Sequence, residues 1–152
     1  MLMPILTGLL LGTLCMALHT VGTSWWLRYS AGRIAQKRNQ GLHFHQVLVL
    51  MASGITFLTM LHVSEILLWA LGYAWLADVP QLGDAEETVY FSFITFTTVG
   101  FGDVVIDKFW RLMAGIQALN GIMLLGWSTA VLMAMAQKIW QSSQRDGGTF
   151  SG

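Results

Sequence analysis

Charged side chains are scarce in this 152-residue chain. They make up 11% of its residues, whereas an ordinary soluble domain carries about 25%. Residues 2–27 and residues 112–137 contain no Asp, Glu, Lys or Arg. Each of these runs exceeds the roughly 20 apolar residues that cross about 30 Å of hydrocarbon. The shortage of charge leaves little room for a soluble domain and predicts that the chain lies in a lipid bilayer.

Cysteine is almost absent, and the side-chain patterns of enzymes are missing. The single cysteine, Cys15, lies inside the first uncharged run, so the sequence excludes an intrachain disulfide and a redox motif. The sequence contains no evident nucleophile and base set, no phosphate-binding loop and no cluster of metal ligands. We therefore expect no enzymatic activity, no small-molecule cofactor and no nucleic-acid partner.

The apolar runs predict an all-α membrane protein with three transmembrane helices. The N-terminal run is too long for a cleaved signal peptide and has no Lys or Arg before it. Between the two uncharged runs, a further apolar segment is interrupted by one charged residue, Glu65. The three predicted transmembrane helices are residues 1–28, 46–77 and 109–140. A basic linker at 29–45 joins the first two, a loop region at 78–108 joins the last two, and residues 141–152 form a tail.

Charge also predicts the orientation of these helices. Half of the eight basic residues lie between the first two spans: Arg28, Arg33, Lys37 and Arg38. Because basic loops stay on the cytoplasmic side, we expect the N-terminus and residues 78–108 outside and the C-terminal tail in the cytoplasm. Six of the eight acidic residues fall in the outer region: Asp78, Asp84, Glu86, Glu87, Asp103 and Asp107. Several copies around one axis would give a negative entrance that concentrates cations, and the alternative is that these are ordinary solvated loop charges.

The most specific motif follows a short helix predicted at residues 85–96, whose first turn Asp84 would cap. The motif reads Thr97-Thr98-Val99-Gly100-Phe101-Gly102-Asp103. Gly100 and Gly102 can take positive φ without steric cost, so the backbone can alternate its hand and keep successive carbonyl oxygens on one side. Such a row of oxygens can replace the water around a cation. The alternative is a glycine-rich turn that falls between apolar helices by chance.

This run resembles the Thr-Val-Gly-Tyr-Gly selectivity filter of potassium channels. Residues 85–137 resemble the pore unit of small bacterial pore-loop potassium channels, with one extra span before it. The resemblance implies a homotetramer in the bacterial inner membrane, with 46–77 as the outer helix, a re-entrant pore helix within 78–108 and 109–140 as the inner, pore-lining helix. It implies K⁺ as the permeant ion and a filter made of Thr98, Val99, Gly100, Phe101 and Gly102, with K⁺ held at the first four of these residues.

The resemblance also implies residues that support the filter, namely Thr97, Tyr90 and Asp103. Asp103 follows the filter directly, where family members use an Asp to hold it against the pore helix. The side chains of Val99 and Phe101 are expected to pack behind the filter. The sequence departs from its relatives in having Phe101 for Tyr, Ile94 where some members have Glu, and no proline after Asp103.

Glu65 stands alone as an acidic residue within a predicted span, and His62 precedes it by three residues on the same helix face. An ionisable group at that depth is costly and points to a function. We expect the His62 and Glu65 pair to support the filter from behind, the alternative being a bonded pair with a packing role only.

The last span contains candidates for a gating hinge or for the cavity lining: Gly121, Asn120, Met123 and Gly126. Gly121 lies near the place where relatives have a hinge, but glycine in a membrane helix also permits close packing. Asn120 is a candidate for the cavity wall or for a hydrogen bond between helices.

The function predicted from these features is a potassium-selective channel that conducts K⁺ passively across the membrane. Two alternatives remain open. The substitution of Phe101 for Tyr and the missing proline allow a poorly selective monovalent cation channel. A non-conducting regulatory membrane protein that keeps the pore fold is the second alternative.

Overall fold

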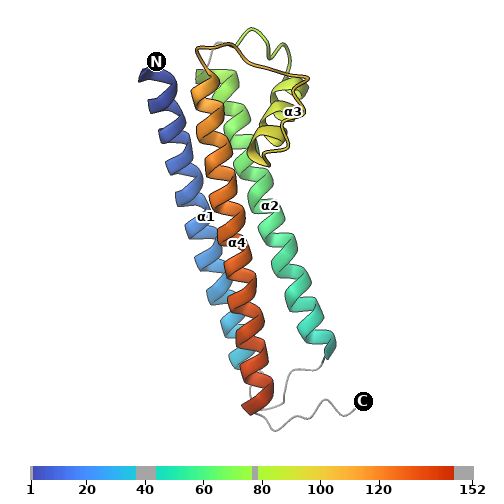
Figure 1. The fold of residues 1–152 in the computed structure, drawn as a ribbon. Coiled ribbons are helices and arrows are strands. Elements are labelled where there is room, and N and C mark those ends of the chain that lie inside the picture. The colour runs from blue at the N-terminus through green and yellow to red at the C-terminus, as the bar shows by residue number, and fades with distance from the viewer. Residues whose placement is uncertain (1, 37–43, 77–78, 146–152) are drawn as a thin grey trace.

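The computed structural model describes residues 2–36, 44–76 and 79–145. These residues form helices and connecting turns without any strand (Figure 1). The helices are α1 (Leu2–Gln36), α2 (Phe44–Leu76), α3 (Ala85–Phe96) and α4 (Arg111–Arg145). Three of them are long and apolar enough to cross a membrane, over Leu2–Arg33, His45–Trp75 and Arg111–Gln141. The predicted all-α fold with three membrane-length helices is confirmed.

The three long helices form one bundle, in which α1 and α4 run in one direction and α2 runs in the opposite direction (Figure 1). α1 lies along α4 and also contacts α2, while α3 packs between α2 and α4. The N-terminus and α3 lie at one end of the bundle, and the C-terminus lies at the other end (Figure 1). Contacts with both α2 and α4 therefore fix the position of α3, and with it the start of the loop that follows α3.

The helices differ from the predicted segments mainly at the basic linker. α1 continues past residue 28 to Gln36, and α2 begins at Phe44, so helix takes up part of the linker predicted at 29–45. Several residues used in the prediction lie outside the described residues: Lys37, Arg38, Asp78 and residues 146–152.

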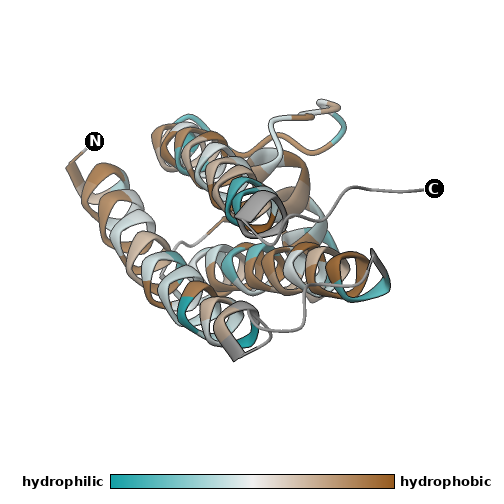
Figure 2. Ribbon diagram, turned by 90° about the horizontal axis from the view of Figure 1, so that it is seen from below, coloured by the Kyte–Doolittle hydropathy of each residue, from teal (hydrophilic) through white to brown (hydrophobic). Residues whose placement is uncertain are grey.

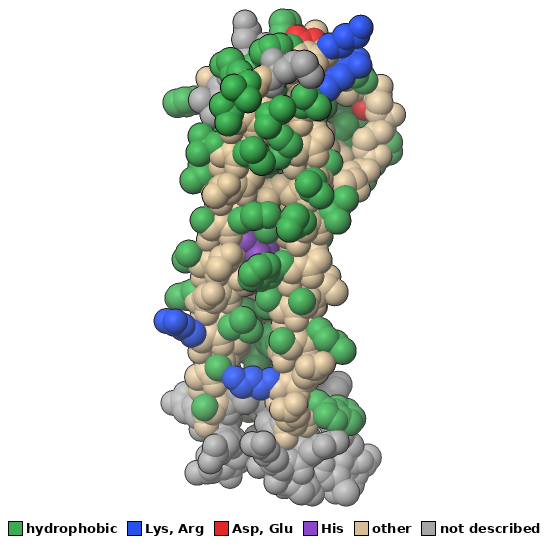
Figure 3. Space-filling view, turned by 60° about the vertical axis from the view of Figure 1, so that its left-hand side comes forward, with side chains coloured by type: hydrophobic (Ala, Val, Ile, Leu, Met, Phe, Trp, Pro, Cys, Tyr) green, Lys and Arg blue, Asp and Glu red, His purple; other side chains and the backbone are tan. Residues whose placement is uncertain are grey.

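The outward faces of the long helices are apolar along most of their length. Seen from below in Figure 2, hydrophobic residues lie on outward as well as inward faces of the helices. Figure 3 shows a band at mid-height without Lys, Arg, Asp or Glu side chains, and histidine is visible within it. Leu10, Ile122 and Met133 are each more than half exposed within the single chain. Such a surface suits lipid or the neighbouring helices of an assembly.

Candidate functional site

The short helix α3 is fixed at its start by a side-chain cap. Asp84 has extended backbone, and its carboxylate accepts a hydrogen bond from the backbone N–H of Glu87 at 2.8 Å. The Glu87 carboxylate accepts in turn from the backbone N–H of Gly83 at 3.0 Å. These bonds satisfy N–H groups that a helix start leaves unpaired, and the two acids of the first turn, Glu86 and Glu87, suit the positive end of the helix dipole.

The loop after α3 has positive φ at three alternate residues. The angles are 60° at Thr98, 50° at Gly100 and 81° at Gly102. Among the described residues, no atom beyond the two chain neighbours lies within 4 Å of a Cβ built on Gly100 or Gly102, so backbone conformation rather than crowding within the chain requires glycine there. The Gly100 N–H donates to the Ile94 carbonyl at 3.1 Å, which ties the loop to the last turn of α3.

The side chains of the loop do not pack within the chain as the sequence predicted. Val99 is 53% exposed and Phe101 is 73% exposed. Within the single chain both side chains are exposed, so the expectation that they pack behind the loop stays a prediction for an assembly.

Tyr90 connects the middle of α3 to the far end of the loop. Its hydroxyl donates to the Asp103 carboxylate at 2.6 Å. The hydrogen bond from Tyr90 lowers the pKa of the Asp103 carboxyl below its ordinary value. The same bond to the carboxylate raises the pKa of the Tyr90 hydroxyl. The loop is thus held to α3 at Gly100 by backbone and at Asp103 by a side chain.

The end of α3 rests directly on the backbone of α4. A Cβ built on Gly121 would overlap the carbonyl group of Phe96, and Phe96 is fully buried. Of the two roles predicted for Gly121, close packing is the one that this contact favours. Thr97, which follows Phe96, bonds the Phe93 carbonyl through its hydroxyl at 2.7 Å.

A buried polar chain fixes the middle of α3 to α2 and α4. The Gln117 amide N–H donates to the Ser92 carbonyl at 3.1 Å and to the Ser92 hydroxyl at 2.8 Å. The Ser92 hydroxyl donates to the Ile66 carbonyl at 2.9 Å, and the Tyr73 hydroxyl donates to the Gln117 side-chain oxygen at 2.9 Å. Gln117 and Ser92 were missed in the sequence, although a glutamine within the uncharged last span was a visible signal.

The other candidates of the last span separate into buried and exposed residues. Asn120 is 4% exposed, accepts from the Trp69 indole N–H at 3.3 Å and donates to the Gly12 carbonyl at 3.3 Å. It therefore joins α4 to α1 and α2, so of the two roles predicted for Asn120 these contacts favour the hydrogen bond between helices. Met123 and Gly126 are exposed within the chain, so they remain available to line a cavity in an assembly.

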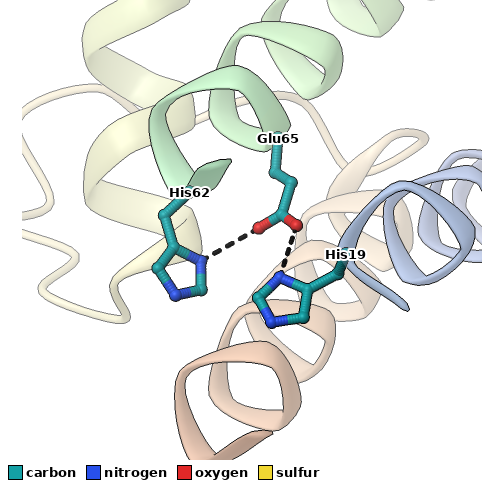
Figure 4. A group of neighbouring side chains, drawn as sticks. All are labelled: His19, His62 and Glu65. Atoms are coloured by element: carbon teal, nitrogen blue, oxygen red, sulfur yellow. Dashed lines mark hydrogen bonds and ion pairs between the residues drawn. The ribbon is translucent and has the colours of Figure 1, made fainter. Parts of the chain in front are cut away.

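Glu65 binds two histidines from two helices (Figure 4). One carboxylate oxygen contacts His19 Nδ1 of α1 at 2.7 Å, and the other contacts His62 Nδ1 of α2 at 2.9 Å. Ser128 of α4 closes a ring, with its hydroxyl 2.8 Å from His62 Nε2 and 3.3 Å from His19 Nε2. We call these four residues the polar ring. The pairing of His62 with Glu65 was predicted from their spacing, whereas the part of His19 was missed.

The polar ring contacts α3 through the His62 ring and not through Glu65. Both carboxylate oxygens of Glu65 are occupied by histidines, and the His62 ring lies 6.0 Å from the Phe96 ring. Glu65 therefore has no bond of its own to α3. The ring also corrects the expectation that the chain has no cluster of metal ligands, because His19, His62 and Glu65 each offer a ligand atom and these atoms all lie within 4.8 Å of one another.

Hydrogen-bond counting defines the protonation that the polar ring needs. Its four contacts require four protons. With Glu65 ionised and both histidines neutral, the two Nδ1–H groups and the Ser128 hydroxyl supply three. A fourth proton shared among these four side chains would satisfy every contact and would make them electrically neutral together.

A family model described as an ion channel matches residues 47–138. The match covers most of α2, all of α3, the loop after it and most of α4, and leaves α1 outside. No curated protein and no solved structure matches the chain.

Proposed function

This chain belongs to the ion channel family, and from that premise we propose that four copies surround one pore that conducts potassium passively across the membrane. The family is not enzymatic, in agreement with the prediction from the sequence. The potassium selectivity, the fourfold assembly and the membrane orientation are the parts that we propose.

The main support for the proposal is that the sign of φ alternates from residue to residue in the loop after α3. Thr98, Gly100 and Gly102 have positive φ, and the residues between them do not. An alternating backbone places successive carbonyl groups on one side of the strand. Four such strands around an axis would give rings of oxygens that replace the hydration shell of K⁺. In this proposal K⁺ is held by the backbone oxygens of Thr98, Val99, Gly100 and Phe101, with Gly102 ending the filter.

The exposed side chains of the loop support a homotetramer. A single chain supplies one filter strand, and a closed ring requires rotational symmetry. Val99 and Phe101 are large, apolar and exposed in the single chain, so a neighbouring subunit would bury them and give the filter its packing. The loop needs such packing because its own chain holds it mainly at Gly100 and Asp103.

The direction of α3, whose C-terminal end precedes the loop, supports a cation-binding role for the loop. Its acidic start is capped, and its C-terminal end lies at Phe96, immediately before the filter. The C-terminal end of a helix carries partial negative charge, which would favour a cation on the pore axis. In the orientation that we propose, α3 and the N-terminus face outward and the C-terminus is cytoplasmic, in a bacterial inner membrane.

A poorly selective monovalent cation channel is the second candidate, because Phe101 has no hydroxyl to bond the surroundings of the filter. Liposomes containing the purified protein, loaded with potassium or sodium gradients, separate the candidates. A flux of K⁺ well above that of Na⁺ supports the proposal, and equal fluxes identify the second candidate. Native mass spectrometry of the same sample should give a tetramer. A tetramer without flux would show a non-conducting protein that retains the fold.

A further inference from the structure

We propose that His19, His62 and Glu65 form a binding site for a divalent transition-metal ion of the zinc type. The site would join α1 to α2 at mid-height of the bundle, with Ser128 of α4 beside it. It lies within a single chain, so it does not depend on the proposed potassium selectivity.

The donor set determines the class of ion. Two imidazole nitrogens and one carboxylate oxygen are a ligand set that zinc uses, with a fourth position left for water. Imidazole nitrogen suits zinc, copper, nickel and iron, whereas magnesium and calcium prefer oxygen ligands alone. The three ligand atoms already lie within 4.8 Å of one another. His19 and Glu65 are fully buried, so they are held in place by their surroundings.

Ser128 supplies the outer contact that metal-binding histidines require. A histidine that binds a metal through Nδ1 carries its proton on Nε2, and that N–H almost always has a partner. Both Nε2 atoms lie near one acceptor, the Ser128 hydroxyl oxygen, at 2.8 Å and 3.3 Å. A hydroxyl oxygen has two lone pairs, so it accepts from both rings. In the metal-bound state each histidine would carry its one proton on Nε2 in place of Nδ1, and both Nε2–H groups would donate to the Ser128 oxygen.

The adjustment that an ion needs is small. Metal–ligand bonds of about 2.0 Å place tetrahedral ligand atoms about 3.3 Å apart. His19 Nδ1 lies 2.7 Å from one carboxylate oxygen of Glu65, and His62 Nδ1 lies 2.9 Å from the other. Each of these two distances would have to lengthen by about half an ångström. The His62 side chain is 13% exposed, in contrast to 1% for His19. His62 is therefore the less tightly enclosed of the two histidines and has more freedom for this movement.

The test uses the purified full-length chain after treatment with a chelator. Isothermal titration should give one Zn²⁺ per chain and none of comparable affinity for Mg²⁺, and Zn²⁺ should raise the unfolding temperature because it binds the folded state. Co²⁺ in place of Zn²⁺ should give the intense visible absorption of four-coordinate cobalt. Absence of saturable Zn²⁺ binding at this stoichiometry would overturn the proposal.

Matched variants assign the site. Glu65→Gln keeps the size and hydrogen-bonding capacity of the side chain but removes its negative charge, so the chain should fold while Zn²⁺ affinity falls more than 100-fold. Ser128→Ala, which removes only an outer contact, should lower affinity by about 10–100-fold. His45→Ala is the control, because His45 is exposed at the start of α2 and lies outside the cluster. Loss of binding in His45→Ala, or unchanged binding in both Glu65→Gln and His19→Ala, would contradict the assignment.

Discussion

Gly121 of α4 lies against the carbonyl group of Phe96, the last residue of α3, so closely that a Cβ atom on Gly121 would overlap it. The atoms that would be displaced are backbone atoms and not the end of a flexible side chain. The lack of a side chain at Gly121 therefore determines how near the last helix comes to the start of the filter loop.

Replacement of Gly121 should consequently harm both the stability and the filter. Gly121→Ala is expected to cost about 1–3 kcal/mol, as overpacking of a buried contact does, and to lower the K⁺ over Na⁺ flux ratio. Thermal unfolding and liposome flux measure the two effects. Gly126→Ala is the control, since among the described residues no atom apart from its chain neighbours and the nearby backbone of α4 lies within 4 Å of a Cβ there. Equal stability of the two variants would show that the close contact is not structurally important.

Gly100 tests the backbone conformation of the loop. Gly100→Ala adds a Cβ at φ of 50°, which costs roughly 1–2 kcal/mol for an L-residue, and we expect the K⁺ over Na⁺ preference to be lost. D-alanine introduced at the same position by chemical ligation favours positive φ and should keep that preference. Flux measurements on both proteins separate conformation from bulk, because a loss in both would mean that the added methyl group itself is harmful.

The bond from Tyr90 to Asp103 predicts a stability that depends on pH in two ranges. The pKa of Asp103 is lowered in the fold, so its contribution is present above the ordinary value of about 3.9 and is lost as pH falls through the lowered pKa. The pKa of Tyr90 is raised, so its contribution is present below about 10 and is lost as pH rises through the raised pKa.

Unfolding temperatures measured across pH check this expectation. Tyr90→Phe should remove the alkaline loss that belongs to this residue and should weaken the acid loss, because Asp103 then has no hydroxyl partner. An alkaline profile of Tyr90→Phe identical to that of the unmodified chain would contradict the assignment of the alkaline loss to Tyr90.

Glu65 is expected to tolerate an amide better than a deletion. A glutamine can accept from one histidine Nδ1–H and donate to the other Nδ1, which lets two neutral histidines and Ser128 satisfy all four contacts. Glu65→Gln should therefore retain the unfolding temperature, while Glu65→Ala leaves buried partners unpaired at a cost of about 1–3 kcal/mol. Thermal unfolding of both variants without added metal decides between them. Equal losses would mean that the charge itself is required.

The sequence predicted those features that depend on local spacing. Uncharged runs predicted the long helices, Asp84 indicated the start of α3, and the interval of three residues paired His62 with Glu65. The contacts that were missed join residues far apart in the chain, such as His19 with Glu65 and Ser92 with Gln117. These depend on how each helix is rotated about its axis. A lipid-facing helix is apolar on most faces, so hydrophobic periodicity does not reveal that rotation. The exposure of Val99 and Phe101 in the single chain was missed for another reason. The sequence was interpreted in terms of an assembly, in which we propose that a neighbouring subunit buries both side chains.

The polar ring has a consequence for the descent of this chain. His19 comes from α1, which lies outside the residues that the ion channel family shares with this chain, and α1 helps to shield the buried carboxyl group of Glu65. Without α1, an acid at position 65 would face hydrocarbon on that side, which is costly. Relatives without the first helix should therefore carry an apolar residue at the position of Glu65, and relatives with the acid should have a histidine or another hydrogen-bonding residue at the position of His19.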